Sequence, residues 1–311
     1  MHVTSCVACI AACLVAVTVA CGSPGPAREV ANAVGTPRAD GRAMIDDAGD
    51  TVRLAAPAMR IVSLNPVTTE ALFAIGAGAR LVGRTHWDTY PPAALKVTDL
   101  GNGMQPNVEA VLATRPDLVV LYASNGNRAA AVAFHRAGVQ TLTLHTDRVA
   151  ELPIALQWLG RVTGDTVAAR VVADSVMRSV AAVRTQAMPS PQPTVFWQAW
   201  DNPVITIGAG SYLNELVETA GARNIFADLP QPSPQVTLES VAQRNPDYIL
   251  VGPGTAARLR TQARWRAVPA VREGRVLVVD TAVVGRPGVR MGEGARSLRA
   301  LLDSAISARH P

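Results

Sequence analysis

"RIVSLNPVTTEALFAIGAGARLVG", residues 60 to 83, decides the fold because its pattern occurs a second time in the chain. The stretch predicts a short apolar strand, a turn-rich loop and a helix that carries Glu70 and stops at a glycine. "NPVITIGAGSYLNELVETAGARNIF", residues 202 to 226, predicts the same order, with Glu215 in the helix. In both copies the glutamate precedes the stopping glycine by six residues. The chain therefore contains two related units of strand and helix.

The repeat continues downstream of both copies. "NVEAVLATRPDLVVLY", residues 107 to 122, aligns with "TLESVAQRNPDYILVG", residues 237 to 252. Each predicts a helix, a Pro-Asp turn and a buried strand. "AGVQTLTL" and "EGRVLVVD" then predict matching last strands, each after a glycine. The order of strands and helices is thus the same in the two halves.

The two halves, near residues 60–147 and 193–304, alternate strand and helix as parallel sheets require. We therefore expect an α/β fold with two similar α/β lobes. Residues 163–188 have apolar positions at helical spacing and no proline, so a single long α-helix is expected to join the lobes. The loops after the carboxyl ends of the strands should form the ligand site.

The first residues have the features of an export signal. All four cysteines lie within the first 21 residues, so the body holds no disulfide framework and no cysteine metal site. Residues 7–20 are apolar but shorter than the roughly 18 to 20 residues that span a membrane. Ala20 and Cys21 resemble the lipobox of bacterial lipoproteins, in which the cysteine is acylated, although Thr18 replaces the usual leucine. Plain secretion is the alternative.

These features give the expected organisation of the chain. A Gly- and Pro-rich stretch without periodicity follows the leader and is expected to be a tether. The expected parts are a lipoprotein signal peptide 1–20, a flexible tether 21–43, an N-terminal lobe 44–147, a connecting helical segment 148–188 and a C-terminal lobe 189–311.

Composition argues against several classes of function. The net charge of +5 comes almost wholly from arginines spread along the chain, so no nucleic-acid partner is expected. The five histidines are too scattered for a metal cluster, and neither catalytic residues nor a cofactor is expected. "GPGTAA", residues 252 to 257, fits a G-x-G-x-x-A pattern, with Asp280 at a strand end downstream. A nucleotide-dependent enzyme is therefore a remote alternative.

Aromatic residues are only 4% of the chain, yet several gather where loops follow strands. "PTVFWQAWDNP" predicts Trp197 in the strand core and Trp200 in the exposed loop. "RTHWDTYPP" places Trp87 and Tyr90 in a turn-rich segment, and Tyr122 ends a strand. The aromatic side chains should therefore meet at the ligand edges of the two lobes.

Several motifs together resemble one family. They are "RIVSLNPVTTEALFAIGAGARLVG", "YPPAALKVTDLGNGMQPNVEAVLATRPDLVV", "PQVTLESVAQRNPDYILV" and "VPAVREGRVLVVD". The chain is similar, over about residues 45–306, to the substrate-binding proteins of iron-siderophore, haem and vitamin B12 ABC importers. The resemblance implies the class III periplasmic-binding-protein fold. It also implies a monomeric, exported receptor, in the periplasm or on the outer face of the cytoplasmic membrane, that serves an ABC permease and its ATPase.

The resemblance also implies roles for residues. In this family one glutamate on each lobe docks to arginines of the permease, and Glu70 and Glu215 match those positions. A carboxylate in the first turns of a helix is alternatively a simple partner of the helix dipole.

The ligand is expected to be a corrinoid, with a ferric siderophore or haem as alternatives. A corrinoid ring edged with amides suits stacking aromatics and a few polar groups. Anionic siderophores favour arginines such as Arg286 and Arg290, and haem needs an axial ligand such as His86 or Tyr90. The expected ligand-binding residues are Asn65, Trp87, Tyr90, Tyr122, Trp200, Tyr212 and Arg286. Ser233 stands where vitamin B12 binders carry a tryptophan, so the ligand stays open.

Overall fold

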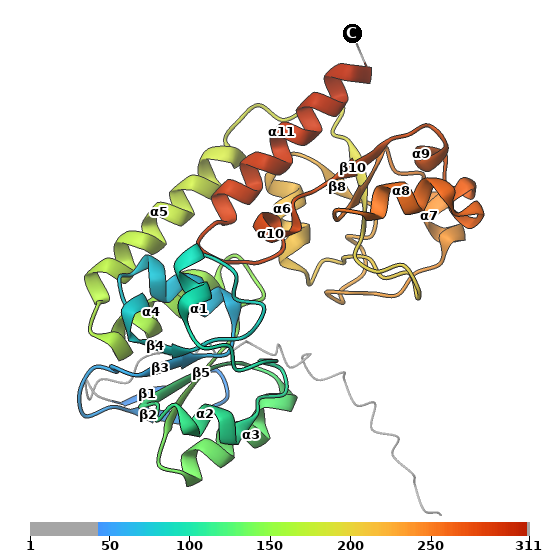
Figure 1. The fold of residues 1–311 in the computed structure, drawn as a ribbon. Coiled ribbons are helices and arrows are strands. Elements are labelled where there is room, and N and C mark those ends of the chain that lie inside the picture. Colours follow the sequence, from blue (N-terminus) through green and yellow to red (C-terminus); the bar gives the residue numbers. More distant parts are fainter. Residues whose placement is uncertain (1–42, 310–311) are drawn as a thin grey trace, which may run out of the picture. The chain divides into compact units, whose positions relative to one another are not determined.

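The computed structural model describes residues 43–309, which form two parallel β-sheets with helices packed on them (Figure 1). The expected signal peptide, Cys21 and nearly all of the expected tether lie outside the described residues. None of the helices within 43–309 is long and apolar enough to cross a membrane.

The N-terminal lobe contains the first sheet. Its elements are β1 (Ala43–Ile45), β2 (Thr51–Arg53), β3 (Ile61–Ser63), α1 (Pro66–Ala74), η1 (Gly78–Arg80), β4 (Leu81–Gly83), η2 (Pro92–Lys96), α2 (Val108–Ala113), β5 (Leu118–Tyr122), α3 (Asn125–Arg136) and β6 (Gln140–Leu144). Two helices follow, α4 (Glu151–Thr163) and α5 (Thr166–Arg184).

The C-terminal lobe contains the second sheet. Its elements are β7 (Thr194–Gln198), α6 (Tyr212–Thr219), β8 (Arg223–Asn224), α7 (Leu238–Arg244), β9 (Tyr248–Val251), α8 (Thr255–Thr261), η3 (Ala263–Ala267), α9 (Pro269–Arg272), β10 (Val276–Val278), α10 (Thr281–Val284) and α11 (Met291–Arg309).

The two sheets have the same topology, as the sequence repeat predicts. The first has the order β4-β3-β5-β6 and the second, read from its β8 edge, β8-β7-β9-β10. All pairs within these sheets are parallel. The prediction of two similar α/β lobes is therefore confirmed. The antiparallel hairpin of β1 and β2 was not predicted.

The equivalent helices α1 and α6 begin and end in the same way. Asn65 caps α1 by accepting a hydrogen bond from the backbone N–H of Val67, and Ser211 caps α6 in the corresponding position. Gly76 and Gly221 follow the helices with φ of 88° and 86°. Glycine adopts this left-handed conformation without strain, which favours the end of both helices just before it.

Two helices, rather than one, lie between the sheets in the chain. Gly164 adopts a left-handed conformation that ends α4, and α5 starts two residues later. α5 has 19 residues and packs against α4 and against α11 (Figure 1). The long helix is thus present, but α4 precedes it.

One apolar core continues through both lobes. It joins one face of each sheet to α4, α5 and α11, and Trp197 belongs to it, as expected for a strand residue. Alternate residues of β5 and β9 face this shared core, whereas the others face a separate core on the outer face of each sheet. Burial of a continuous core through the linking helices makes large independent motions of the lobes costly.

Candidate functional site

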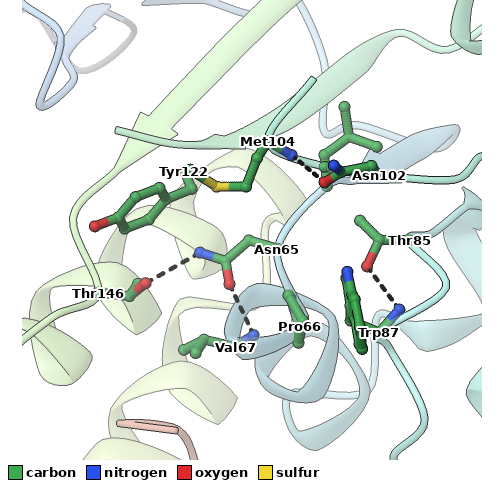
Figure 2. Close-up of a pocket in the computed structure, with 11 residues that line it drawn as sticks. Asn65, Pro66, Val67, Thr85, Trp87, Asn102, Met104, Tyr122 and Thr146 are labelled. Atoms are coloured by element: carbon green, nitrogen blue, oxygen red, sulfur yellow. Dashed lines mark hydrogen bonds between the residues drawn. The ribbon is translucent and has the colours of Figure 1, made fainter. Parts of the chain in front are cut away.

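A cavity of about 240 Å³ lies at the carboxyl-terminal edge of the N-lobe sheet. Its walls come from the end of β5, from segments that follow β3, β4 and β6, and from the start of α1, at the edge where loops of parallel sheets bind ligands (Figure 2). The lining residues are Leu64, Asn65, Pro66, Val67, Thr85, Trp87, Asn102, Gly103, Met104, Tyr122 and Thr146. Three of the residues expected from the sequence, Asn65, Trp87 and Tyr122, are among them.

Asn65 forms a fixed part of the cavity wall. Its Oδ1 accepts from the N–H of Val67, and its Nδ2 donates to Oγ1 of Thr146, both at 3.0 Å (Figure 2). The side chain is buried. These bonds tie the start of α1 to the segment after β6, so the amide cannot turn freely toward a ligand.

Tyr122 contributes a neutral phenol to the cavity. Its hydroxyl donates to Oδ1 of Asp147 at 2.7 Å. Burial, and then the hydrogen bond and negative charge of Asp147, raise the pKa of Tyr122 well above its usual value. The group therefore stays protonated at physiological pH and is a weak candidate for an anionic metal ligand.

Trp87 and Tyr90 present aromatic surface to solvent. The side chains are 59% and 39% exposed, and Trp87 lines the cavity. The backbone N–H of Trp87 donates to Oγ1 of Thr85 at 3.2 Å. The centroid of the Trp87 ring lies 4.5 Å from that of the His86 ring. The Tyr90 ring lies under the guanidinium of Arg290 at 4.0 Å, a cation–π contact.

The C-lobe residues expected at the site are divided. Trp200 is 63% exposed in the loop after β7, and its Nε1 donates to the carbonyl of Asn202 at 3.1 Å. Tyr212 is only 5% exposed, and its hydroxyl donates to the carbonyl of Val284. Burial raises the pKa of Tyr212. Trp200 is therefore accessible to solvent, whereas Tyr212 is part of the core.

Glu70 is buried and paired with the other lobe. Its carboxylate accepts from Nε and Nη2 of Arg290 at 3.1 and 2.9 Å and from Nη1 of Arg286 at 3.4 Å. The Glu70 side chain is 2% exposed. Arg286, expected to face the ligand, instead pairs with Glu70 and donates to the carbonyl of Trp87 at 2.7 Å.

Glu215 has a matching partner. Its carboxylate is paired with Arg148, which lies between β6 and α4 in the N-lobe segment, and it also accepts from the N–H of Val149 at 3.3 Å. The Glu215 side chain is more accessible than that of Glu70. Both family glutamates are therefore ion-paired within the chain.

Several site residues were missed in the sequence. Thr85, Met104 and Thr146 line the cavity, and Asp88 lies buried beside it. Asp88 accepts from the hydroxyls of Thr69 on α1 and of Thr85. Its position next to Trp87 in a turn-rich segment could have identified it in the sequence. An acidic side chain buried in a loop commonly holds that loop in place by hydrogen bonds.

The buried Asp88 carboxyl predicts a pH effect. Burial raises its pKa above the ordinary value of 3.8, against the opposing hydrogen bonds of Thr69 and Thr85. The native state thus holds this proton to higher pH than the unfolded state does. Its stabilising contribution is complete below pH 3.8 and is lost as pH rises through the native pKa.

Urea unfolding of the wild type and of Asp88→Asn, between about pH 4 and about pH 7, measures this effect. The wild type should lose stability relative to Asp88→Asn as pH rises. Asp174→Asn, at an exposed position on α5, is the control and should keep a constant offset. A constant offset for Asp88→Asn as well would contradict the assignment.

The described residues contain no group of three or more His, Cys, Asp or Glu side chains that could hold a metal ion. The "GPGTAA" segment follows β9, which is the third strand of its lobe in chain order, and leads into α8 of only seven residues. A dinucleotide fingerprint belongs after the first strand of its unit and before a full helix. The "GPGTAA" segment therefore does not have the position of a dinucleotide fingerprint.

Two similar α/β lobes, an apolar core shared through the linking helices and a pocket at a sheet edge define a two-lobed ligand-binding protein. The chain belongs to the periplasmic binding protein family, whose model matches residues 61–283.

Relatives and solved structures agree with this assignment. The vitamin B12-binding protein of Vibrio cholerae serotype O1 is 27% identical over 235 residues, 75% of this chain and 85% of the relative. An uncharacterised ABC transporter substrate-binding lipoprotein of Bacillus subtilis, YvrC, is 30% identical over 263 residues, 82% of this chain and 83% of the relative.

Two solved structures have the same fold. The periplasmic vitamin B12-binding protein BtuF of Vibrio cholerae has a TM-score of 0.69 and 26% identity, covering 80% of this chain and 98% of that chain. The periplasmic haem-binding protein BhuT, in complex with two haems, has a TM-score of 0.71 and 24% identity, covering 81% and 100%.

Proposed function

We propose that this chain is the substrate-binding protein of an ABC importer and captures a corrinoid between its two lobes. In this proposal a lipid on Cys21 holds the exported protein at the membrane, where it delivers the ligand to a permease and its ATPase. Relatives named as vitamin B12-binding proteins and as a substrate-binding lipoprotein support it.

The exposed aromatic side chains carry the proposal. Trp87 and Tyr90 follow β4, and Trp200 follows β7, so both sheets present aromatic rings in loops at their carboxyl edges. Exposed aromatic rings in loops at this edge of a parallel sheet suit a binding site. A corrinoid offers a broad ring for stacking and peripheral amides for neutral polar partners such as Tyr122. The cavity of about 240 Å³ is smaller than a typical ligand pocket and would hold one edge of such a ligand.

The arginines favour a corrinoid over an anionic ferric siderophore. Arg286 and Arg290 contact the loop that carries Trp87 and Tyr90, and their guanidiniums already bind Glu70. An anionic ligand would have to displace a buried carboxylate to reach them, which costs the energy of that ion pair.

Haem is the second candidate. His86 is exposed next to Trp87, and an exposed imidazole beside an aromatic ring suits axial ligation of a planar metal chelate. Haem-binding proteins have the same fold as this chain.

Docking to the permease is assigned to Glu70 and Glu215, one on each lobe. Glu215 is the more accessible of the two. Docking through Glu70 would require its pairs with Arg286 and Arg290 to open, so the two glutamates should differ in how readily they engage a partner.

Truncation of the aromatic surface tests the ligand assignment. Trp87→Ala and Trp200→Ala should each weaken cyanocobalamin binding by about tenfold or more, because each removes a stacking face worth roughly 1.4 kcal/mol or more. Calorimetric titration measures the change. Val171→Ala, at an exposed position on α5, is the control and should bind as the wild type does. Unchanged affinity in both tryptophan variants would contradict the assigned surface.

A further inference from the structure

The ion pairs of Glu70 and Glu215 cross between the lobes in a reciprocal pattern. Glu70 lies on α1 of the N-lobe, and its arginines lie between α10 and α11, after the last strand of the C-lobe. Glu215 lies on the equivalent helix α6 of the C-lobe, and Arg148 lies after β6, the last strand of the N-lobe. Each lobe thus extends the segment after its last strand to the first helix of the other lobe.

The pair at Glu70 is the more buried of the two. Arg290 holds the carboxylate with two nitrogens, and its side chain is 13% exposed, against 42% for Arg148 in the other pair. Two-nitrogen contacts between arginine and carboxylate are among the stronger hydrogen-bonded pairs, and burial reduces screening by salt. The hydrogen bonds and charge of Glu70 raise the pKa of Arg290.

The same arginines hold the aromatic loop. Nη2 of Arg286 donates to the carbonyl of Trp87 at 2.7 Å, and the guanidinium of Arg290 lies over the Tyr90 ring. On its other side the loop is tied to α1, because the Thr69 hydroxyl donates to Asp88. The segment 86–90 is therefore anchored both to its own lobe and to the opposite one.

Two of the three guanidinium nitrogens of each arginine already donate hydrogen bonds within the protein. Arg290 uses Nε and Nη2 for Glu70, and Nη2 also donates to the carbonyl of Ala282 at 2.7 Å. Arg286 uses Nη1 for Glu70 and Nη2 for Trp87. Their geometry suits holding a loop better than receiving a ligand.

We propose that Arg286 and Arg290 are positioning residues, which use Glu70 as an anchor to set the Trp87 and Tyr90 rings relative to the C-lobe. We call the side chains of Glu70, Arg286 and Arg290 the clasp. The clasp fixes the spacing between the aromatic loop and the lobe that carries Trp200, and so selects ligands that fit that spacing. This selection rests on the proposed ligand-binding function, whereas the hold on the loop does not.

Hydrogen exchange without ligand tests the hold on the loop. The N–H groups of His86, Trp87, Asp88 and Thr89 are all hydrogen-bonded. The double variant Arg286→Gln/Arg290→Gln should speed exchange in the segment 86–90 by about tenfold or more, because loss of the anchor favours local opening. Arg244→Gln, which breaks the exposed pair with Asp228, is the matched control and should leave this segment unchanged.

Spin labels test the hold between the lobes. The chain from Gly22 onward has no native cysteine, so cysteines introduced at the exposed Val132 on α3 and Val278 on β10 would be the only labelled sites. The distance distribution between them should broaden in the double variant. Arg290→Lys keeps the charge but not the two-nitrogen geometry, and should give an intermediate width.

Single Arg286→Gln provides a milder variant if the double variant does not fold, since it removes the Trp87 contact and leaves Arg290 on Glu70. Unchanged exchange in 86–90, together with an unchanged distance distribution, would overturn the proposal. Faster exchange in the double variant, together with no binding of cyanocobalamin by the wild type, would support the clasp and contradict the proposed ligand. Faster exchange with cyanocobalamin affinity lowered about tenfold would support both.

Discussion

Replacing Glu70 by alanine is expected to lower the free energy of unfolding by about 3 kcal/mol. The substitution leaves Arg286 and Arg290 close together without their shared counter-ion, in a site where the carboxylate is 2% exposed. Breaking a buried pair by removing one partner typically costs about 3 to 5 kcal/mol. We expect the lower end because Arg286 keeps some contact with solvent.

Urea unfolding measures the loss, with Glu109→Ala on α2 as the control. Glu109 is an exposed glutamate in the first turn of a helix of the same lobe, so its replacement should change stability by less than about 0.5 kcal/mol. A loss below about 1 kcal/mol for Glu70→Ala would place its pair among ordinary surface pairs and contradict the buried ion pair.

Replacing Trp265 by alanine is expected to cost about 4 kcal/mol of stability. Trp265 is fully buried in the outer core of the C-lobe, with its ring 6.1 Å from that of Phe196. Its Nε1 donates to Oδ1 of Asp201 at 3.0 Å, in the loop that carries Trp200. The truncation therefore empties a large volume and releases one hold on that loop.

Trp200→Ala is the matched control, because it makes the same substitution at an exposed position of the same lobe. Its effect on the unfolding midpoint in urea should correspond to less than about 0.5 kcal/mol. Equal losses in the two variants would mean that Trp200 packs in the core and is not free for a ligand.

The fold could be predicted in detail because local patterns repeat. Apolar strands, the Pro-Asp turns and the glycines after α1 and α6 each depend on neighbouring residues. Together they predicted two parallel sheets with the same order of elements along the chain, but not the order of strands within each sheet. The hairpin of β1 and β2 was missed, since its strands have three residues each and little periodicity. The long helix was expected over residues 163–188, and α5 lies within that range; the left-handed Gly164 separates it from α4, which the sequence did not resolve as a separate helix.

The site was predictable only in part. The sequence predicted that loops after the strands would line a cavity, because parallel strands present their carboxyl ends at one edge, and Asn65 and Trp87 do line one. The direction of a side chain was not predictable: Tyr212 begins a helix whose apolar face is buried, so its ring enters the core. Arg286 pairs with Glu70, 216 positions away, and no local pattern reports a contact at that separation. Long-range contacts of polar side chains depend on the packed lobes.

Calorimetric titration of the chain from Gly22 onward with cyanocobalamin, and in parallel with haemin and a ferric siderophore, tests the central claim most directly. The aromatic loops and the engaged arginines predict one-to-one binding of cyanocobalamin that is tighter than binding of either iron chelate. No heat with cyanocobalamin, together with saturable binding of the ferric siderophore, would contradict the corrinoid assignment and would mean that the arginines, not the tryptophans, receive the ligand.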